Sequence, residues 1–386
     1  MRVLYLAHDL DDTAIWRRVE MLRRAGADVV VAGFQRGEAP APDGALVLGR
    51  TQNGRLVARA AQVARTLPTL RRRLEQAFGQ DGVDVILARN LEMLLLARSL
   101  RAGPPVIYEL LDIHRVMLRE DAIGRAMRAL ERRLLRKVAQ VWISSPGFEE
   151  QYLGPYGQGA RDTLLVENKP LVQGDPPQTP PRLSLAEPGR ITIAWPGILR
   201  CAWSLGVLDA LTRAAPGRYR VVLRGRPARD AVPGFDSVVA ANPDLEFGGA
   251  YAWPDDLPQI YGQCDLAWLI DRFDAGRNSD WLLPNRLYEG ALHGAVPIVL
   301  AGTQVARRAA SENCGVIVER PDLAAVTDTL GRLDAAGIAA QRERLAATPR
   351  AHWAASQEDC DRLVAALGRA AAGGGKVQSP AKEGAS

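Results

Sequence analysis

The chain has 386 residues, which is too long for one ordinary hydrophobic core and predicts two or three domains. Its composition, 47% hydrophobic and 24% charged, predicts a soluble globular protein. The apolar run 91–100 is too short for a membrane span of about 20 residues. The four cysteines are scattered and form no Cys-x-x-Cys pair, which predicts reduced thiols in the cytoplasm. The net charge of +5 divides into +6 for residues 1–170 and −1 for residues 171–386, so an anionic surface would meet the first half.

Short apolar strands alternate with amphipathic helices through the first half. The predicted elements are strands at 2–7, 28–34, 84–88, 105–111 and 141–145, and helices at 15–26, 91–100 and 125–141. The first strand has too short an apolar core for a signal peptide, and acidic residues follow it directly.

The stretch 173–188 interrupts this alternation with five prolines, which suit neither a helix nor a central strand. The alternation then resumes, with strands predicted at 190–197, 219–225, 265–270 and 295–302 and helices at 203–214, 254–264 and 352–370. This order predicts an α/β protein of two Rossmann-like, doubly wound parallel-sheet domains that face a central cleft.

The predicted domain organisation follows from these elements. Its parts are a first domain at 1–172, a hinge at 173–188, a second domain at 189–348, a helix returning to the first domain at 349–370 and a disordered tail at 371–386.

The segment 279–299 has the chemistry of an anion site. Pro284 suits the first helical position, so the amides of Asn285, Arg286 and the next residue point out of the helix start beside the positive end of its dipole. The Arg286 guanidinium matches phosphate oxygens, and Glu289 lies one turn deeper, where its carboxylate suits two vicinal hydroxyls. The alternative is an ordinary helix with a solvent-facing Glu289.

The sequence of this segment, PNRLYEGALHGAVPIV, resembles the donor-binding segment of family-4-like GT-B glycosyltransferases. The chain as a whole is most similar to bacterial exopolysaccharide glycosyltransferases of the succinoglycan-synthesis kind. Further segments that carry the resemblance are ARNLEML (88–94), LDIH (111–114), SSPGF (144–148), ENK (167–169), RGRP (224–227) and NSDWL (278–282).

The resemblance implies a nucleotide-sugar donor on the second domain, with Glu289 on the ribose and Arg286 on the diphosphate. The implied donor-binding residues are Gly197, Arg200, Arg224, Asn278, Asp280, Trp281, Asn285, Arg286 and Glu289. Trp281 stands where the family often has a Glu that contacts the donor sugar. The turn 201–206 also lacks the family's Lys, so the sugar and the retaining or inverting outcome stay open.

Candidate bases for the acceptor hydroxyl lie at strand ends of the first half. They are His8, Asp9, Asp112 and His114, the last three of which have a capping role as their alternative, and a retaining mechanism needs no base from the protein. The paired aspartates at 11–12 and 255–256 are adjacent rather than spaced. We therefore expect no metal site and no cofactor, and the resemblance implies a nucleotide sugar, UDP-linked, as substrate.

Basic residues in the first half predict contact with an anionic membrane, which suits a lipid-linked acceptor. In 125–141, arginines at 125, 128, 132 and 136 are predicted on one helical face, opposite apolar residues at 130, 134, 138 and 141; the stretch 65–74 is also basic. The alternative is a solvated charged face. No aromatic residues interleave with these arginines, so nucleic-acid binding is not favoured.

These observations together predict a metal-independent, cytoplasmic hexosyltransferase, peripheral on the inner face of the cell membrane, which acts on a lipid-linked saccharide in exopolysaccharide or cell-surface glycan synthesis. The alternatives are a nucleotide-sugar epimerase of the same architecture and an inactive scaffold that binds a sugar nucleotide. A dinucleotide dehydrogenase is disfavoured, because no GxGxxG motif follows the first strand.

Overall fold

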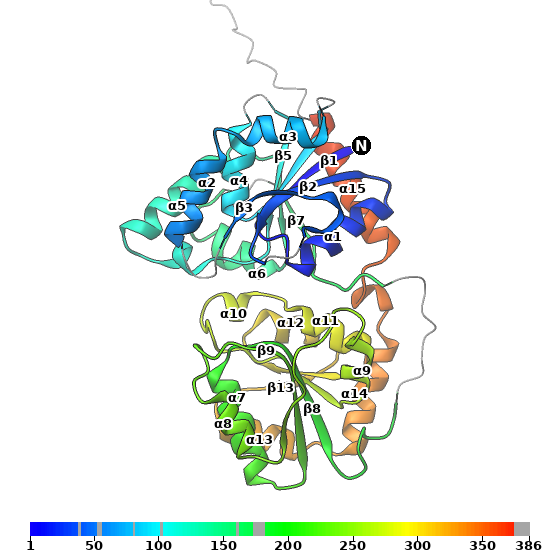
Figure 1. Cartoon of the computed structure of the whole chain (residues 1–386). Helices are drawn as coiled ribbons and strands as arrows, with labels where there is room; N and C mark the ends of the chain where they lie inside the picture. The colour runs from blue at the N-terminus through cyan, green and yellow to red at the C-terminus, as the bar shows by residue number, and fades with distance from the viewer. Residues whose placement is uncertain are drawn as a thin grey trace, which may run out of the picture. The chain divides into compact units, whose positions relative to one another are not determined.

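The computed structural model describes residues 1–37, 40–51, 56–79, 82–100, 103–159, 162–172 and 182–373. These residues form two compact units, each built on a parallel sheet between helices (Figure 1). The described parts of Met1–Ser144, Glu149–Val166 and Gln357–Ser386 make up the first unit, and those of Ser145–Phe148 and Glu167–Ser356 make up the second.

The borders of the units fall at different places from those expected. Residues 167–172 and 349–356 belong to the second unit, where the Lys169 ammonium donates to the Ala351 carbonyl at 2.8 Å and the Ala355 amide donates to the Pro170 carbonyl at 2.9 Å. Most of the expected hinge and nearly all of the expected tail lie outside the described residues.

The first unit contains a seven-stranded sheet in its described part, ordered β3-β2-β1-β4-β5-β6-β7 with every pair parallel. Its strands are β1 (Arg2–Ala7), β2 (Asp28–Gln35), β3 (Leu46–Arg50), β4 (Val85–Arg89), β5 (Val106–Leu110), β6 (Gln140–Ile143) and β7 (Thr163–Leu165). Strands β1 and β4 to β6 are almost wholly buried, as continuous apolar strands in a sheet covered on both faces should be.

Helices cover both faces of this sheet. They are α1 (Thr13–Arg24), α2 (Leu56–Thr66), α3 (Leu70–Phe78), α4 (Leu91–Ser99), α5 (Ala122–Leu135) and α15 (Gln357–Gly373), with short helical turns η1 (Pro42–Gly44), η2 (Arg115–Leu118) and η3 (Glu149–Leu153). In Figure 1, α1 and α15 lie on one side of the sheet and α2, α4 and α5 on the other. Asp12 begins α1 by accepting the Ala14 amide at 2.9 Å.

The second unit repeats the same winding. Its six described strands are ordered β10-β9-β8-β11-β12-β13 and are all parallel. They are β8 (Ile191–Leu199), β9 (Tyr219–Pro227), β10 (Leu245–Phe247), β11 (Leu266–Trp268), β12 (Val296–Leu300) and β13 (Val316–Val318).

The helices of the second unit complete its two layers. They are α6 (Pro146–Phe148), α7 (Ala202–Ala214), α8 (Phe235–Ala240), α9 (Leu257–Gly262), α10 (Asn278–Trp281), α11 (Asn285–Leu292), α12 (Gln304–Ser311), α13 (Leu323–Gly331), α14 (Ala335–Ala347) and the turn η4 (Arg350–His352). Figure 1 shows α7, α8 and α13 on one side of this sheet and α9 and α14 on the other.

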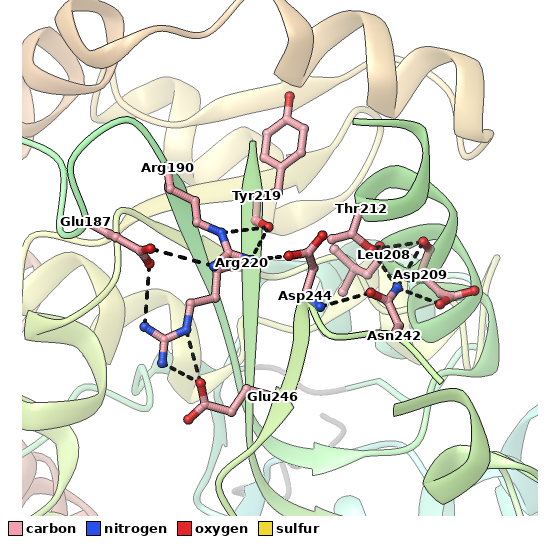
Figure 2. Close-up of polar contacts among 10 residues, drawn as sticks. All are labelled: Glu187, Arg190, Leu208, Asp209, Thr212, Tyr219, Arg220, Asn242, Asp244 and Glu246. Atoms are coloured by element: carbon pink, nitrogen blue, oxygen red, sulfur yellow. Dashed lines mark hydrogen bonds and ion pairs between the residues drawn. The ribbon is translucent and has the colours of Figure 1, made fainter. Parts of the chain in front are cut away.

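A polar network joins the amino-terminal ends of β8, β9 and β10 (Figure 2). Arg190 bonds the Tyr219 carbonyl at 3.2 Å and pairs with Asp244, while Arg220 pairs with Glu246. These contacts fix the register at the end of the sheet that is remote from the strands' carboxyl ends. In both units the strand order reverses beside the first strand, at β1/β4 and β8/β11, and ligands of such sheets bind beyond the carboxyl ends at that point.

Candidate functional site

Two glycines stand opposite each other near the carboxyl ends of β8 and β9. Gly197 and Gly225 are register partners with φ of 112° and 122°. A Cβ on Gly225 would lie 2.0 Å from the Gly197 carbonyl oxygen, so this close approach requires glycine. Gly197 presents its open face to Arg286, whose Cδ lies 3.9 Å from the position a Cβ would take. The expected backbone turn and the expected cation are therefore neighbours.

Helix α11 begins one residue later than expected, because Pro284 is its N-cap and Asn285 its first residue. The Leu287 amide donates to the Pro284 carbonyl at 3.0 Å, which leaves the amides of Asn285 and Arg286, two rather than three, without an intrahelical acceptor. These amides and the positive end of the helix dipole lie beside the Arg286 side chain. The start of α11 thus has the donors of an anion site, though fewer than the sequence indicated.

Arg286 has a guanidinium group with no hydrogen-bond or ion-pair partner among the described residues, and its Nη1 atom is buried. A buried N–H group without an acceptor costs about 1–3 kcal/mol. An anion bound beside Gly197 would supply that acceptor.

Glu289 lies inside the unit, with 2% of its surface exposed. The Trp253 indole N–H donates to Oε1 at 2.9 Å, and the Tyr261 hydroxyl donates to Oε2 at 3.4 Å. Gly290 lets the helix approach this closely, since a Cβ there would lie 3.1 Å from the Ala267 Cβ. The alternative of a solvent-facing Glu289 is therefore wrong.

Tyr251 lies close enough to Glu289, Arg286 and Arg224 for their charges to shift its pKa. Burial, reinforced by the negative charge of Glu289, raises the pKa of Tyr251 to about 12, against the opposing positive charges of Arg286 and Arg224. A neutral hydroxyl thus lies among one carboxylate and two guanidinium groups. The two guanidinium groups favour an anionic ligand such as a diphosphate.

Arg224 reaches this cluster from the end of β9. Its Nε atom is buried without a partner, and its Nη2 donates to the Ala250 carbonyl at 3.4 Å and lies 3.8 Å from Asp256. Gly248 makes room for it, because a Cβ there would lie 2.5 Å from the Arg224 Cδ. We define the donor cluster as Gly197, Arg224, Tyr251, Trp253, Arg286 and Glu289.

The other predicted donor residues make different contacts. Arg200 pairs with Asp271 at 3.2 Å and lies over the Phe273 ring, so its charge is already engaged. Asn278 is buried at the start of α10, and Asp280 accepts the Gly276 amide at 2.7 Å, with its Oδ1 buried and unpartnered.

Trp281 ends α10, and its carbonyl accepts a hydrogen bond from the Ser145 hydroxyl. Its backbone also fixes the neighbouring segment, since a Cβ on Gly147 would lie 2.5 Å from the Trp281 carbonyl oxygen. These contacts hold α10 to α6; they do not bring the Trp281 backbone to the donor cluster.

Three aromatic residues of the site were not predicted, namely Tyr251, Trp253 and Tyr261. The available signal was the pair Gly248-Gly249 followed by aromatic residues directly after a strand, in FGGAYAW (247–253). Asp256, just beyond this stretch, occupies the N-cap of α9, where its side chain accepts the Ala252 amide at 2.8 Å instead of an amide of the helix.

In the first unit, His114 is exposed and caps η2, where its Nδ1 accepts the Val116 amide at 3.3 Å. Partial desolvation, with the positive charge of Arg59, lowers the pKa of His114, so the ring is neutral. A neutral ring that accepts at Nδ1 carries its proton on Nε2, and Nε2 is then a donor. This geometry does not suit the base role expected of His114.

Asp9 and Asp112 differ in exposure. Asp9 is buried, pairs with Arg36 at 3.0 Å and accepts the Asp11 amide at 3.2 Å, and burial raises its pKa against the charge of Arg36. Asp112 is exposed just beyond β5.

A second group of unpartnered atoms lies where the strand order of the first unit reverses. They are Nδ1 of His8, Nη2 of Arg89 and Oδ1 of Asn90, all buried. The Arg89 Nε–H donates to the Glu109 carboxylate at 2.9 Å, and Asn90 has a positive φ of 71°. Burial, with the charge of Arg89, lowers the pKa of His8 to about 3, so His8 is neutral. Arg89 and Asn90 were not predicted as site residues.

Among the described residues, no group of three or more His, Cys, Asp or Glu side chains is arranged to hold a metal ion. The positive charge of the donor cluster comes from arginines and a helix start.

Comparisons with known proteins agree with this architecture. Residues 12–169 match the family described as "Glycosyl transferase 4-like domain". The chain is 41% identical over 384 residues to the succinoglycan biosynthesis protein ExoL of Rhizobium meliloti, covering 95% of this chain and 93% of that protein.

Solved structures show the same fold at low sequence identity. Sucrose-phosphate synthase from Thermosynechococcus elongatus matches with a TM-score of 0.70 and 16% identity over 96% of this chain and 98% of that one. Anabaena HepE in complex with UDP and glucose matches with a TM-score of 0.67 and 15% identity over 95% and 98%. The two doubly wound units, the family match and the full-length relative lead to one conclusion: the chain is a GT-B glycosyltransferase of the family-4-like kind and belongs to the family of succinoglycan biosynthesis protein ExoL.

Proposed function

We propose that this glycosyltransferase moves a hexose from a UDP-linked sugar to a lipid-linked saccharide in the synthesis of a succinoglycan-type exopolysaccharide. The relative in R. meliloti supports the pathway class, and the HepE structure with UDP and glucose supports the donor class. The observation that carries the proposal is the unpartnered Arg286 guanidinium beside Gly197 and above the buried Glu289.

The proposed role of the donor cluster follows from the charge that develops during transfer. As the glycosidic bond breaks, the departing diphosphate gains negative charge, and Arg286, Arg224 and the first amides of α11 would stabilise that charge. Loss of one such preorganised donor costs roughly 3–4 kcal/mol in other enzymes. Gly197 would let the diphosphate lie against the backbone of β8. The Glu289 carboxylate, which Trp253 and Tyr261 orient, would accept hydrogen bonds from the ribose hydroxyls.

The acceptor side of the proposal rests on the first unit. The unpartnered atoms of His8, Arg89 and Asn90 combine donors with acceptors, which suits sugar hydroxyls better than a phosphate. If transfer needs a base, we assign it to Asp112, an exposed carboxylate just beyond β5, because His114 presents a donor at Nε2 and Asp9 is buried.

The test is a thermal-shift titration of the full chain with UDP and UDP-glucose. We expect both ligands to stabilise the wild type, and we expect Arg286→Gln and Glu289→Gln to lose that stabilisation. Arg320→Gln is the matched control, since Arg320 is exposed in the same unit and pairs with Asp322. Equal stabilisation of all four proteins would remove α11 from the donor site.

An inactive scaffold would give the same ligand-induced stabilisation, so a second measurement is needed. UDP release that depends on a lipid-linked saccharide acceptor supports transfer. UDP binding without release, with acceptors extracted from a polysaccharide-producing cell, supports the scaffold.

A further inference from the structure

The outward surface of α5 differs from the sequence expectation. Arg128 does not join the charged face: it is buried, donates to the Met117 carbonyl and lies over the Tyr156 ring. Leu130, expected in the core, is half-buried. The residues exposed on α5 and in the two positions after it are Ala122, Ile123, Arg125, Ala126, Ala129, Arg132, Arg133, Arg136 and Lys137.

No carboxylate lies among these exposed residues, and the exposed Glu120 and Asp121 lie just before them. The acidic residue of α5, Glu131, is buried and accepts hydrogen bonds from Tyr108, Tyr152 and Gln158. The outward surface of α5 therefore carries positive charge without a neutralising acid of its own.

Three of its cations are also uncommitted. Arg133, Arg136 and Lys137 have no hydrogen-bond or ion-pair partner among the described residues. Arg125 and Arg132 donate to backbone carbonyls, of Glu120 at 2.6 Å and Tyr156 at 3.3 Å, so their charges are also not neutralised.

The same surface is apolar or small where it is not charged. Ile123 is 54% exposed, a high value for an isoleucine, and lies next to the alanines of the first turns. The side chains on this surface include no aromatic residue, and the stacking partners that single-stranded nucleic acids need are therefore missing from it. A basic helix face with an aliphatic component is typical of a helix that lies on an anionic lipid surface.

We propose that the outward surface of α5 binds an anionic membrane, with Ile123 entering the headgroup region and Arg133, Arg136 and Lys137 pairing with lipid phosphates. This goes beyond the transfer reaction, because it assigns a lipid partner to a helix outside both groups of site residues. None of the helices in the described part of the chain has the length and hydropathy of a membrane span.

The experiment is sedimentation of the full chain with vesicles of phosphatidylcholine alone or of equal parts phosphatidylcholine and phosphatidylglycerol. We expect binding to the anionic vesicles, at least about 100-fold weaker in Arg133→Glu/Arg136→Glu/Lys137→Glu, since each basic residue near such a surface contributes about 1 kcal/mol and 1.4 kcal/mol is tenfold. The control is Arg229→Glu/Arg320→Glu/Arg332→Glu, which makes the same charge change at exposed residues of the second unit and should bind as the wild type does.

A separate variant, Ile123→Ser, tests insertion. It should bind anionic vesicles at low salt but dissociate from them at a lower salt concentration than the wild type. Salt screens the electrostatic attraction, and the variant lacks the apolar contact of Ile123, which salt does not screen. Equal weakening by both triple variants would overturn the proposal. The proposal would also be overturned if the wild type did not bind vesicles but bound DNA, and the α5 triple variant lost that DNA binding. UDP-induced stabilisation should be the same in every variant, so this test can fail without the donor-site proposal failing.

Discussion

At the scale of single residues, the site depends on how one buried carboxylate is held. Glu289 lies in the interior, and two aromatic side chains, Trp253 and Tyr261, donate to its two oxygens. Burial raises the pKa of Tyr261 far above its usual range, so its hydroxyl remains a donor at all ordinary pH values. The carboxylate is thereby oriented before any ligand arrives.

Trp253→Phe removes the indole N–H but keeps an aromatic ring. Hydrogen bonds to charged groups contribute about 1.5–3 kcal/mol, so we expect a loss of that order in urea unfolding and about tenfold weaker UDP binding, or roughly 1.4 kcal/mol. Trp203→Phe is the control, because Trp203 stacks on Trp268 in the same unit. Isothermal calorimetry gives the affinities; an unchanged UDP affinity in Trp253→Phe would mean that Glu289 binds independently of the indole.

At the scale of elements, the donor cluster depends on two strands continuing to pair as far as their ends. The register of β8 and β9 runs from Ile191↔Tyr219 to Leu199↔Pro227 and includes the pair Gly197↔Gly225. The Gly225 amide also donates to the Gly249 carbonyl at 2.7 Å, which ties the Gly-Gly turn after β10 to the same place. Any side chain at this position would separate the strands where the diphosphate is proposed to bind.

Gly225→Ala places a Cβ about 2 Å from the Gly197 carbonyl at a positive φ. We expect more than about 2 kcal/mol of lost stability, from overpacking and backbone strain together, and loss of UDP binding. Gly206→Ala is the control: Gly206 is exposed in α7, a Cβ there meets nothing within 4 Å, and alanine should add about 0.5–1 kcal/mol. Chemical denaturation measures the free energy of unfolding, and equal values for Gly225→Ala and Gly206→Ala would contradict this expectation.

At the scale of the whole molecule, the first unit is completed by the far end of the chain. Cys360, Leu363 and Leu367 face inward from α15, which packs on α1, β4 and β5. Gln357 donates to the Arg24 carbonyl at 3.3 Å and Arg362 to the Leu165 carbonyl at 3.3 Å. The core of the first unit therefore depends on residues more than 350 positions from its first strand.

Leu367→Ala opens a cavity in that core and should cost about 2–5 kcal/mol. Hydrogen exchange should quicken in α1, β4 and β5 and stay unchanged in β8, β9 and β12. Leu345→Ala, a buried leucine of α14, should produce the reverse pattern. Faster exchange in both units of either variant would show that they unfold together.

The sequence by itself determined the alternation of the inner strands with helices, the two-unit α/β architecture and the likeness to glycosyltransferases, because hydrophobic period, glycine and proline positions and helix starts act over a few residues. It did not predict the short edge strands β3, β7, β10 and β13. It also offered Arg286, Glu289 and Gly197 as candidate site residues. The tertiary structure alone decided which donors surround Glu289, which arginines are already paired and which face of α5 is exposed. Those outcomes depend on packing between segments far apart in the chain: Trp253 reaches Glu289 across 36 positions, Asp271 takes the charge of Arg200 across 71, and Arg128 turns inward to carbonyls that no local pattern reveals.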